Sequence, residues 1–250
     1  MRLDKFLSNN TSASRTEVRR LIKTQAVQVN GIPASNAAMH IAADDDVLLN
    51  NTPVVNIGKL YYMLHKPAGT ICANQDGSYP TVLDLLAQRV NDVSGESLNI
   101  PRAQELQIAG RLDLDTTGLV LITNDGQWNH QVTSPNSGCK KVYAVTLAQA
   151  FNPETRDAFS TGIQLDGEKK PTLPATIELV DNTHLLLTIQ EGKYHQIKRM
   201  FAATGNSVIG LHRLSIGQIK LDPTLKAGQF RPLTQTEITG VNQRPKPEGQ

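Results

Sequence analysis

Residues 110–118, with the sequence GRLDLDTTG, form a dense polar stretch with side chains that could carry out chemistry. Asp113 and Asp115 alternate with leucines, and the stretch leads directly into the apolar run 119–122. A carboxylate at the start of a buried strand can act as a nucleophile or as a base. Asp, Thr and Gly also form hydrogen-bonded turns, so a purely structural turn is an equally good interpretation.

Two other kinds of site fit this stretch less well. In a calcium loop Asp113, Asp115 and Gly118 would occupy positions 1, 3 and 6, but position 12 is Asn124, where a bidentate Glu is required. The stretch also resembles the Asp-x-Asp-x-Thr nucleophile of haloacid dehalogenase-like phosphotransferases. That chemistry needs a buried strand before the first aspartate and an acidic pair downstream. Here a glycine and Arg111 precede the aspartate, and no acidic pair follows.

A second polar cluster, residues 191–201, combines a turn at Gly192 with a helix expected over residues 194–204. The first turn of that helix would carry Tyr, His, Gln, Lys and Arg side chains. Helix N-termini bind anions, and a lysine beside a deep carboxylate would keep that carboxylate ionised and positioned. In the alternative interpretation the apolar residues of the helix pack into the core and its charges are solvated.

The first thirty residues predict two short helices. Apolar residues recur with i, i+3, i+4 spacing over residues 3–7 and again over residues 18–22. Ser14 and Glu17 form a capping-box pattern at the start of the second helix. Basic residues repeat every four positions along that helix, at Arg15, Arg19 and Lys23.

A hairpin and a linker follow these helices. Asn30 and Gly31 predict a two-residue hairpin turn, and residues 47–49 predict the strand that closes the unit. Residues 50–58 contain Asn-Asn-Thr-Pro and read as a linker. We therefore expect a small N-terminal domain with its linker over residues 1–58.

The larger remainder of the chain predicts a mixed, mainly antiparallel sheet with flanking helices, so that the whole protein is α+β. The expected strands cover residues 60–64, 119–123, 141–147, 176–180 and 185–189, and the expected helices cover residues 82–89, 127–133, 154–160 and 194–204. Tyr143 lies on one of these strands, where its hydroxyl needs a hydrogen-bond partner if it is buried. We expect this domain to span residues 59–241, followed by a disordered tail over residues 242–250.

Composition and charge narrow the class of protein. The chain has 250 residues, 39% of them hydrophobic, and its apolar runs are far shorter than the roughly 20 residues of a membrane span. Two cysteines are too few for a disulfide framework, and we expect a cytoplasmic protein. Residues 1–30 carry a net charge of +4 and residues 191–231 one of +5, so the rest of the chain carries −7. Two basic regions of this kind could neutralise the phosphates of a polyanion, although solvated faces would look the same.

Several common sites are absent from the sequence. There is no phosphate-binding or dinucleotide-binding glycine loop, no Gly-x-Ser-x-Gly nucleophile, and no metal-ligand spacing among the histidines and cysteines. We therefore expect an enzyme that uses no cofactor and no metal and is built around an aspartate.

Four segments in order resemble the motif set of the RsuA-type pseudouridine synthases: residues 62–69, 110–113, 141–143 and 192–200. The N-terminal residues resemble an S4 RNA-binding domain, which usually precedes that catalytic domain. One departure is His65, where the family more often has Asn before Lys-Pro.

The resemblance implies that the chain isomerises a specific uridine of 16S ribosomal RNA to pseudouridine. Asp113 matches the catalytic aspartate, which either attacks C1′ or removes the 2′ proton. Tyr143 matches the tyrosine that stacks on the uracil. Lys198 matches the basic partner of the aspartate, with Arg199 the alternative by one register. Asp115 would be structural.

Further residues are expected to bind the RNA substrate. They are Lys66, Arg111, His195, Gln196 and Arg199 in the catalytic domain, and Arg15, Arg19, Arg20 and Lys23 in the S4-like domain. The expected partner is 16S ribosomal RNA, naked or in a partly assembled small subunit, and the protein is expected to be a monomer that does not bind membranes. The alternative is an RNA-binding ribosome-assembly factor on the same scaffold with little or no catalysis.

Overall fold

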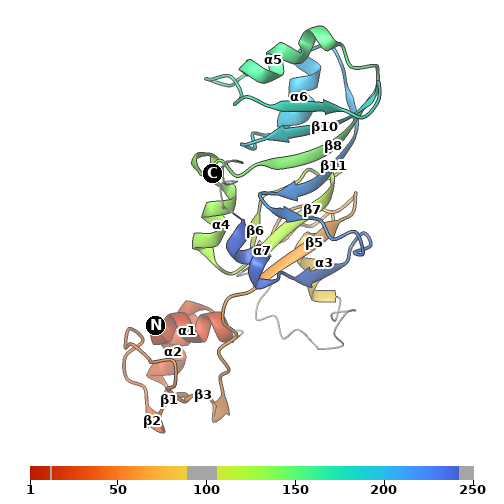
Figure 1. Ribbon diagram of the computed structural model, residues 1–250. Coiled ribbons are helices and arrows are strands. Elements are labelled where there is room, and N and C mark those ends of the chain that lie inside the picture. The colour runs from red at the N-terminus through yellow and green to blue at the C-terminus, as the bar shows by residue number, and fades with distance from the viewer. Residues whose placement is uncertain (12, 89–105, 242–250) are drawn as a thin grey trace, which may run out of the picture. The chain divides into compact units, whose positions relative to one another are not determined.

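The computed structural model describes residues 1–11, 13–88 and 106–241 (Figure 1). The chain divides into two compact units, of which unit 1 is Met1–Leu60 and unit 2 begins at Tyr61. The tail expected to be disordered, residues 242–250, lies outside the described residues. None of the helices in the described ranges combines the length and apolar character needed to cross a membrane.

Unit 1 contains two helices and a small antiparallel sheet of order β2-β1-β3-β4. Its elements are α1 (Leu3–Asn10), α2 (Arg15–Lys23), β1 (Val27–Val29), β2 (Ile32–Pro33), β3 (Val47–Leu49) and β4 (Thr52–Pro53). The predicted capping box is confirmed: the Ser14 hydroxyl accepts from the Glu17 amide while the Glu17 carboxylate accepts from the Ser14 amide. Apolar side chains of both helices and of β1 and β3 form one core.

Two tight turns shape the sheet of unit 1. Asn30 and Gly31 both have positive φ, as the predicted hairpin turn requires. Asn50 and Asn51 also have positive φ and turn the chain back so that Thr52–Pro53 pair with β3. The prediction of a linker over residues 50–58 was therefore wrong at its start, because the Asn-Asn pair makes a second hairpin.

Unit 2 is built on a nine-stranded sheet of order β13-β5-β7-β11-β8-β10-β9, with β12 beside β11 and β6 beside β7. Its strands are β5 (Tyr61–Lys66), β6 (Gln107–Ala109), β7 (Thr117–Thr123), β8 (Lys141–Leu147), β9 (Thr176–Leu179), β10 (His184–Ile189), β11 (Val208–Ile216), β12 (Ile219–Lys220) and β13 (Phe230–Pro232). Among the strand pairs of the described residues only β7 and β11 are parallel. The predicted mixed, mainly antiparallel sheet is confirmed.

Helices cover this sheet in two groups. They are α3 (Val82–Gln88), α4 (Gly126–Thr133), α5 (Arg156–Thr161), α6 (Gln196–Ala203) and α7 (Gln235–Gly240). The indole of Trp128 on α4 donates to the carbonyl of Ile238 on α7, and Ile238 packs against the core that Trp128 forms with Met63 and Leu121. The helices α5 and α6 form a second group, in which Phe159 of α5 packs against Phe201 of α6 beside β10 (Figure 1).

The sequence did not predict β11, which is the longest strand. It contains a glycine and pairs with β8 through two register shifts, so the apolar residues do not alternate strictly. It also did not predict β6, β12 and β13, each of two or three residues. Arg89, at the end of the predicted helix 82–89, lies outside the described residues.

The pairing of β7 with β11 brings the polar stretch 110–118 beside the centre of the sheet. Gly118 lies opposite Arg213 with φ +105, and a Cβ at this glycine would lie 2.3 Å from the Arg213 carbonyl oxygen. Only glycine permits so close an approach of two backbones. This close approach brings the start of β7 together with the strands β8 and β11 around one cleft.

Candidate active site

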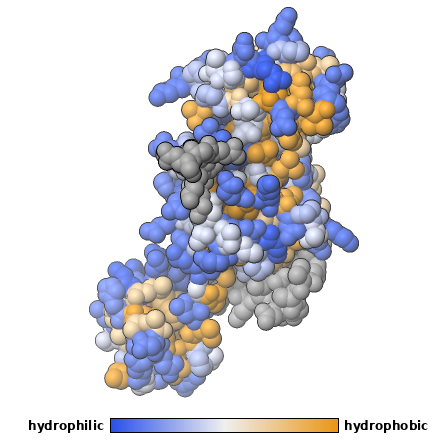
Figure 2. Space-filling model, viewed as in Figure 1, coloured by the Kyte–Doolittle hydropathy of each residue, from blue (hydrophilic) through white to orange (hydrophobic). Residues whose placement is uncertain are grey.

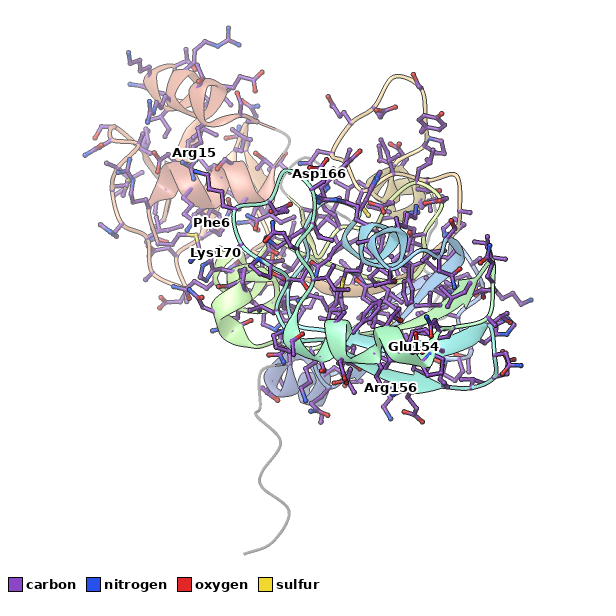
Figure 3. All side chains as sticks on the ribbon, turned by 90° about the horizontal axis from the view of Figure 1, so that it is seen from above. Phe6, Arg15, Glu154, Arg156, Asp166 and Lys170 are labelled. Carbon is purple, nitrogen blue, oxygen red and sulfur yellow. The ribbon has the colours of Figure 1, made fainter. Side chains whose placement is uncertain are left out.

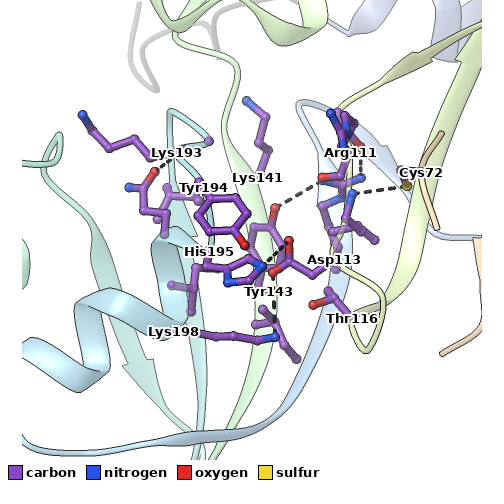
Figure 4. Close-up of a pocket in the computed structure, with 18 of the residues that line it drawn as sticks. Cys72, Arg111, Asp113, Thr116, Lys141, Tyr143, Lys193, Tyr194, His195 and Lys198 are labelled. Carbon is purple, nitrogen blue, oxygen red and sulfur yellow. Dashed lines mark hydrogen bonds and ion pairs between the residues drawn. The ribbon is translucent and has the colours of Figure 1, made fainter. Parts of the chain in front are cut away.

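A cleft of about 740 Å³ opens in unit 2 between the loop before β7, the strands β8 and β11, and the turn before α6 (Figure 4). Six of the residues predicted from the sequence line it: Arg111, Asp113, Tyr143, His195, Gln196 and Lys198. These side chains come from three separate segments of the chain and meet in one concave site, as expected of an active site.

Two basic side chains face the Asp113 carboxylate. Nε2 of His195 lies 3.6 Å from one oxygen, and Nζ of Lys198 lies 3.8 Å from the other. The Asp113 side chain is about 30% exposed, so it is partly shielded yet open to the cleft. Its backbone carbonyl accepts from the Thr116 amide and closes the turn that presents it. Asp113 is thus a carboxylate oriented by two basic groups, and its cleft could admit a substrate.

Lys198 contacts Asp115 more closely than it contacts Asp113. Its ammonium donates to both Asp115 oxygens at 2.6 and 2.8 Å. This hydrogen bond is the main cause that lowers the pKa of Asp115 below its ordinary value. Lys198 therefore lies between the two aspartates, hydrogen-bonded to Asp115 and within ion-pair distance of Asp113.

His195 lies outside the helix that was predicted to contain it. Its backbone has φ 47° and ψ 34°, a left-handed conformation that ends the turn, and α6 begins at Gln196. The prediction of a helix from residue 194 was wrong because this conformation cannot continue a right-handed helix. The conformation directs the imidazole toward Asp113 (Figure 4).

Two of the residues expected to bind RNA make contacts that hold this region together. Gln196 is buried; its amide oxygen accepts from the Lys193 backbone and its amide nitrogen donates to Glu191. Arg199 pairs with Glu168 at 3.1 Å and also donates to the Asp166 carbonyl. Arg199 is therefore neither the partner of the aspartate nor a group facing the cleft.

Lys66 also has a different place from the one expected. Its side chain is fully buried, and its ammonium donates to the carbonyls of Pro67, Leu114 and Thr116 at 3.0, 3.2 and 2.7 Å. Burial lowers the pKa of Lys66 below its ordinary value of 10.5. Because the ammonium donates to three carbonyl oxygens, Lys66 braces the loop that carries Asp113.

Arg213 is the residue of the site that sequence reasoning missed. It is fully buried on β11, and its guanidinium donates to the carbonyls of Gly110 at 2.6 Å and Leu119 at 2.7 Å. A third bond, at 3.2 Å, runs to the hydroxyl oxygen of Tyr143 on β8. One side chain thus ties both ends of the polar stretch to the strand that carries the tyrosine. Its only signal in the sequence was its place among the basic residues of 191–231, and it had no predicted strand to belong to.

Tyr143 and Arg111 lie on the wall and the rim of the cleft. Tyr143 is 6% exposed, and the Arg213 guanidinium carbon lies 5.8 Å from the centre of its ring. The expected need of a buried tyrosine for a hydrogen-bond partner is met by Arg213. Arg111 is exposed, and its guanidinium makes no hydrogen bond or ion pair with another residue of the described ranges, so it is available to a ligand.

The basic residues predicted for unit 1 lie on the outside of α2. They are Arg15, Arg19, Arg20 and Lys23, all exposed. Figure 3 marks Arg15 at the start of this helix, and Figure 2 shows hydrophilic side chains predominating over unit 1 on the visible face. Val18 and Ile22 of the same helix are buried, so α2 presents one apolar face to the core and one basic face to solvent.

The arrangement in the cleft suits chemistry at a carbon atom by a carboxylate. Asp113 can attack or take a proton, His195 and Lys198 can balance its charge, and Tyr143 offers a ring beside it. Within the described ranges no three His, Cys, Asp or Glu side chains are grouped so that they could hold a metal ion.

Comparisons with known proteins identify the family of the chain. Residues 60–203 match the RNA pseudouridylate synthase family, and residues 1–47 match the S4 domain. The chain is 46% identical to the ribosomal small subunit pseudouridine synthase A of Pasteurella multocida (strain Pm70) over 97% of this chain and all of that protein. It is 45% identical to the protein of the same name from Escherichia coli (strain K12), over 96% of this chain and all of that one.

A solved structure gives the same result for the fold. The crystal structure of a pseudouridylate synthase, 43% identical, matches with a TM-score of 0.66 over 96% of this chain and 99% of that one. The resemblance of the four segments and of the N-terminal unit is thereby confirmed. On its fold, its cleft and these comparisons, the chain belongs to the RNA pseudouridylate synthase family, with an S4 domain at its N-terminus.

Proposed function

We propose that this protein converts a uridine of 16S ribosomal RNA to pseudouridine, with Asp113 as the catalytic carboxylate. The observation that carries this is the position of Asp113 in the cleft, with His195 and Lys198 at its two oxygens. Relatives that match almost the whole chain are named ribosomal small subunit pseudouridine synthase A, which supports the choice of RNA. We place the activity in the cytoplasm and in a monomer.

The reaction is an isomerisation that needs no other reactant. The bond from N1 to C1′ of the uridine breaks, the uracil turns over, and a bond from C5 to C1′ forms. The C5 proton then leaves and N1 gains one, so atoms balance. Bond breaking at C1′ builds positive charge on the sugar. Asp113 can form a covalent bond to C1′, or it can take the 2′ proton to give a glycal-like intermediate.

The other residues of the cleft have supporting roles in this proposal. His195 and Lys198 orient the Asp113 carboxylate. Tyr143 stacks against the uracil and is positioned to assist loss of the C5 proton. Arg111, exposed at the rim, contacts the flipped nucleotide or its phosphate. No cofactor takes part in any of these steps.

The target base must leave its stack to enter the cleft, which costs a few kcal/mol. Phosphate contacts from a basic surface can offset this cost. We assign these contacts to residues 1–58 through Arg15, Arg19, Arg20 and Lys23, and the chemistry to residues 59–241. The exposed basic face of α2 supports this division of labour.

Tritium release from RNA labelled at C5 of uridine tests the proposal directly. Wild type and Asp113→Asn would be compared on 16S rRNA, naked and as a partly assembled subunit, without added metal. We expect release by wild type and a loss of at least about 1000-fold in the variant, because the amide can neither attack nor take a proton. RNA binding by the variant should stay within a few-fold of wild type.

Two results would overturn the proposal. Release by Asp113→Asn at the wild-type rate would remove the aspartate from the chemistry. No release by wild type from either form of RNA, despite tight binding, would show an RNA-binding assembly factor instead.

A further inference from the structure

Tyr194 presents a large aromatic side chain to solvent at the edge of the cleft. Its side chain is among the most exposed large apolar groups of the described residues, with 76% of the residue accessible, and it lines the cleft. One face of its ring lies flat on the imidazole of His195, with ring centres 3.8 Å apart and planes inclined by 18° (Figure 4). The imidazole covers one face of the ring, and the high exposure of the residue leaves the rest of the side chain open to solvent.

The turn that carries Tyr194 is held in place from both sides. The Lys193 amide donates to the Gln196 side chain at 2.8 Å, and the Arg199 guanidinium donates to the Tyr194 carbonyl at 3.0 Å. Arg199 is itself paired with Glu168. His195, the next residue, has a left-handed backbone that is uncommon for a residue with a Cβ. An apolar ring is therefore held in an exposed position, which is unfavourable in free energy. Burial of the ring against a bound partner would offset this free energy.

We propose that Tyr194 is a stacking platform for the nucleobase next to the uridine that is isomerised. This inference rests on the function proposed above. His195 contacts Asp113, so the ring stacked on His195 lies beside the nucleotide that reacts. Unstacked RNA bases bind to aromatic faces whatever their sequence, and a base on Tyr194 would extend the stack already formed with His195. Arg111, an exposed cation that lines the same cleft, favours a polyanion over an apolar protein surface.

The first test compares three substitutions in the full-length protein. Tyr194→Phe and Tyr194→Trp keep an aromatic ring, whereas Tyr194→Ala removes it. Tyr79→Ala is the matched control, because Tyr79 is also an exposed tyrosine of unit 2, 48% accessible. We expect Tyr194→Ala to raise Kd for 16S rRNA and KM about tenfold with kcat within about threefold, and the other three proteins to stay within about twofold of wild type. The dependence of Kd on salt should not change, since no charge is removed.

The second test asks whether the partner of the ring is a base. An RNA fragment carrying the modified uridine would be made with an abasic site at either neighbouring position. In wild type one of the two abasic sites should weaken binding about tenfold. In Tyr194→Ala the same abasic site should cost little more, because the two changes remove one contact.

Several results would overturn the inference. The inference is wrong if Tyr194→Ala and wild type have equal Kd and KM, or if Tyr194→Phe and Tyr194→Ala lose RNA affinity equally. It is also wrong if the losses in affinity from the abasic site and from Tyr194→Ala simply add. A loss seen only on the partly assembled subunit would assign the ring to a ribosomal protein instead. Failure of the proposed function is separate, because it would appear as absence of pseudouridine with the wild-type protein.

Discussion

Arg213 of β11 and Tyr143 of β8 lie directly opposite each other in the sheet and are joined by a hydrogen bond of 3.2 Å from the guanidinium to the phenol oxygen. The same guanidinium binds the carbonyls on both sides of the Asp113 loop. The tyrosine and the aspartate, which come from different segments, are therefore held in one geometry by a single buried side chain that faces neither solvent nor a carboxylate of the described residues.

Replacement of Arg213 should disturb both groups at once. In Arg213→Lys the charge stays, but a single ammonium cannot reach both carbonyl oxygens and the tyrosine hydroxyl oxygen that the branched guanidinium contacts. We expect kcat to fall about 100-fold with KM within about threefold, and the free energy of unfolding to fall by about 2–4 kcal/mol. Steady-state kinetics and urea unfolding measure the two effects. Tyr143→Phe supplies the second corner of a double-mutant cycle, and losses in kcat that simply add would show that the two residues do not act together.

Gly118 is where the backbones of β7 and β11 come closest. In Gly118→Ala the added Cβ would meet backbone atoms of Arg213 at 2.3 and 2.6 Å, and φ is +105°. We expect the free energy of unfolding to fall by about 3 kcal/mol or more, because backbone cannot move aside as a flexible side chain can. Gly77→Ala, where the Cβ would meet nothing within 4 Å, should change it by less than about 1 kcal/mol in the same denaturation experiment. Equal stability of the two variants would contradict the close approach.

Stability should fall in acid partly through Asp222. Hydrogen bonds from Thr224 and then Arg231 lower the pKa of Asp222 from 3.8 to about 2. A carboxyl group with a pKa lowered in the folded state stabilises the fold above its unfolded pKa, and this contribution is lost progressively as the pH falls from about 5 to about 1. Denaturation at pH 7, 4, 3 and 2 should show Asp222→Asn less stable by about 1 kcal/mol at pH 7, with a difference from wild type that shrinks steadily and is small at pH 2.

A carboxylate outside this cluster provides the control for the acid experiment. Glu154 is exposed and forms no ion pair with the described residues, so Glu154→Gln should follow the wild-type curve at every pH. The role of Asp222 would be refuted by a constant difference between Asp222→Asn and wild type over the whole pH range.

The basic face of α2 should contribute to RNA binding through charge. Arg15→Glu combined with Arg19→Glu removes two exposed cations, neither of which packs in the core. We expect weaker binding to 16S rRNA and a plot of log Kd against log salt that is flatter by about 1.5 to 2 units. Circular dichroism should show the fold intact.

Arg15→Lys combined with Arg19→Lys is the matched variant, because it keeps the charge and alters only the shape of the side chains. It should retain the wild-type salt dependence. If both double variants bind RNA as wild type does, α2 is not part of the RNA-binding surface.

Local sequence patterns predicted much of the fold. The capping box at Ser14 and Glu17 and the turn at Asn30 and Gly31 each depend on neighbouring residues alone, and both are present. The strand Lys141–Leu147 has its predicted bounds, and its side chains alternate between buried and half-buried positions with the period of a strand. The segments that line the cleft could be named for the same reason, since each contains its own cluster of polar residues.

The sequence could not decide which charged residues face the substrate and which hold the site together. Lys66 and Arg199 look like ligands for RNA in the sequence, yet their partners are oxygens of distant residues. Arg213 lies on a strand whose bulges interrupt the alternation, so no local pattern marked it. A Lys or Arg side chain is long enough to serve either role, and its choice depends on carbonyls and carboxylates brought near it by strand pairing. The sequence by itself determined many of the elements and the family, whereas the contacts between strands far apart in the chain decided the role of each charge in the cleft.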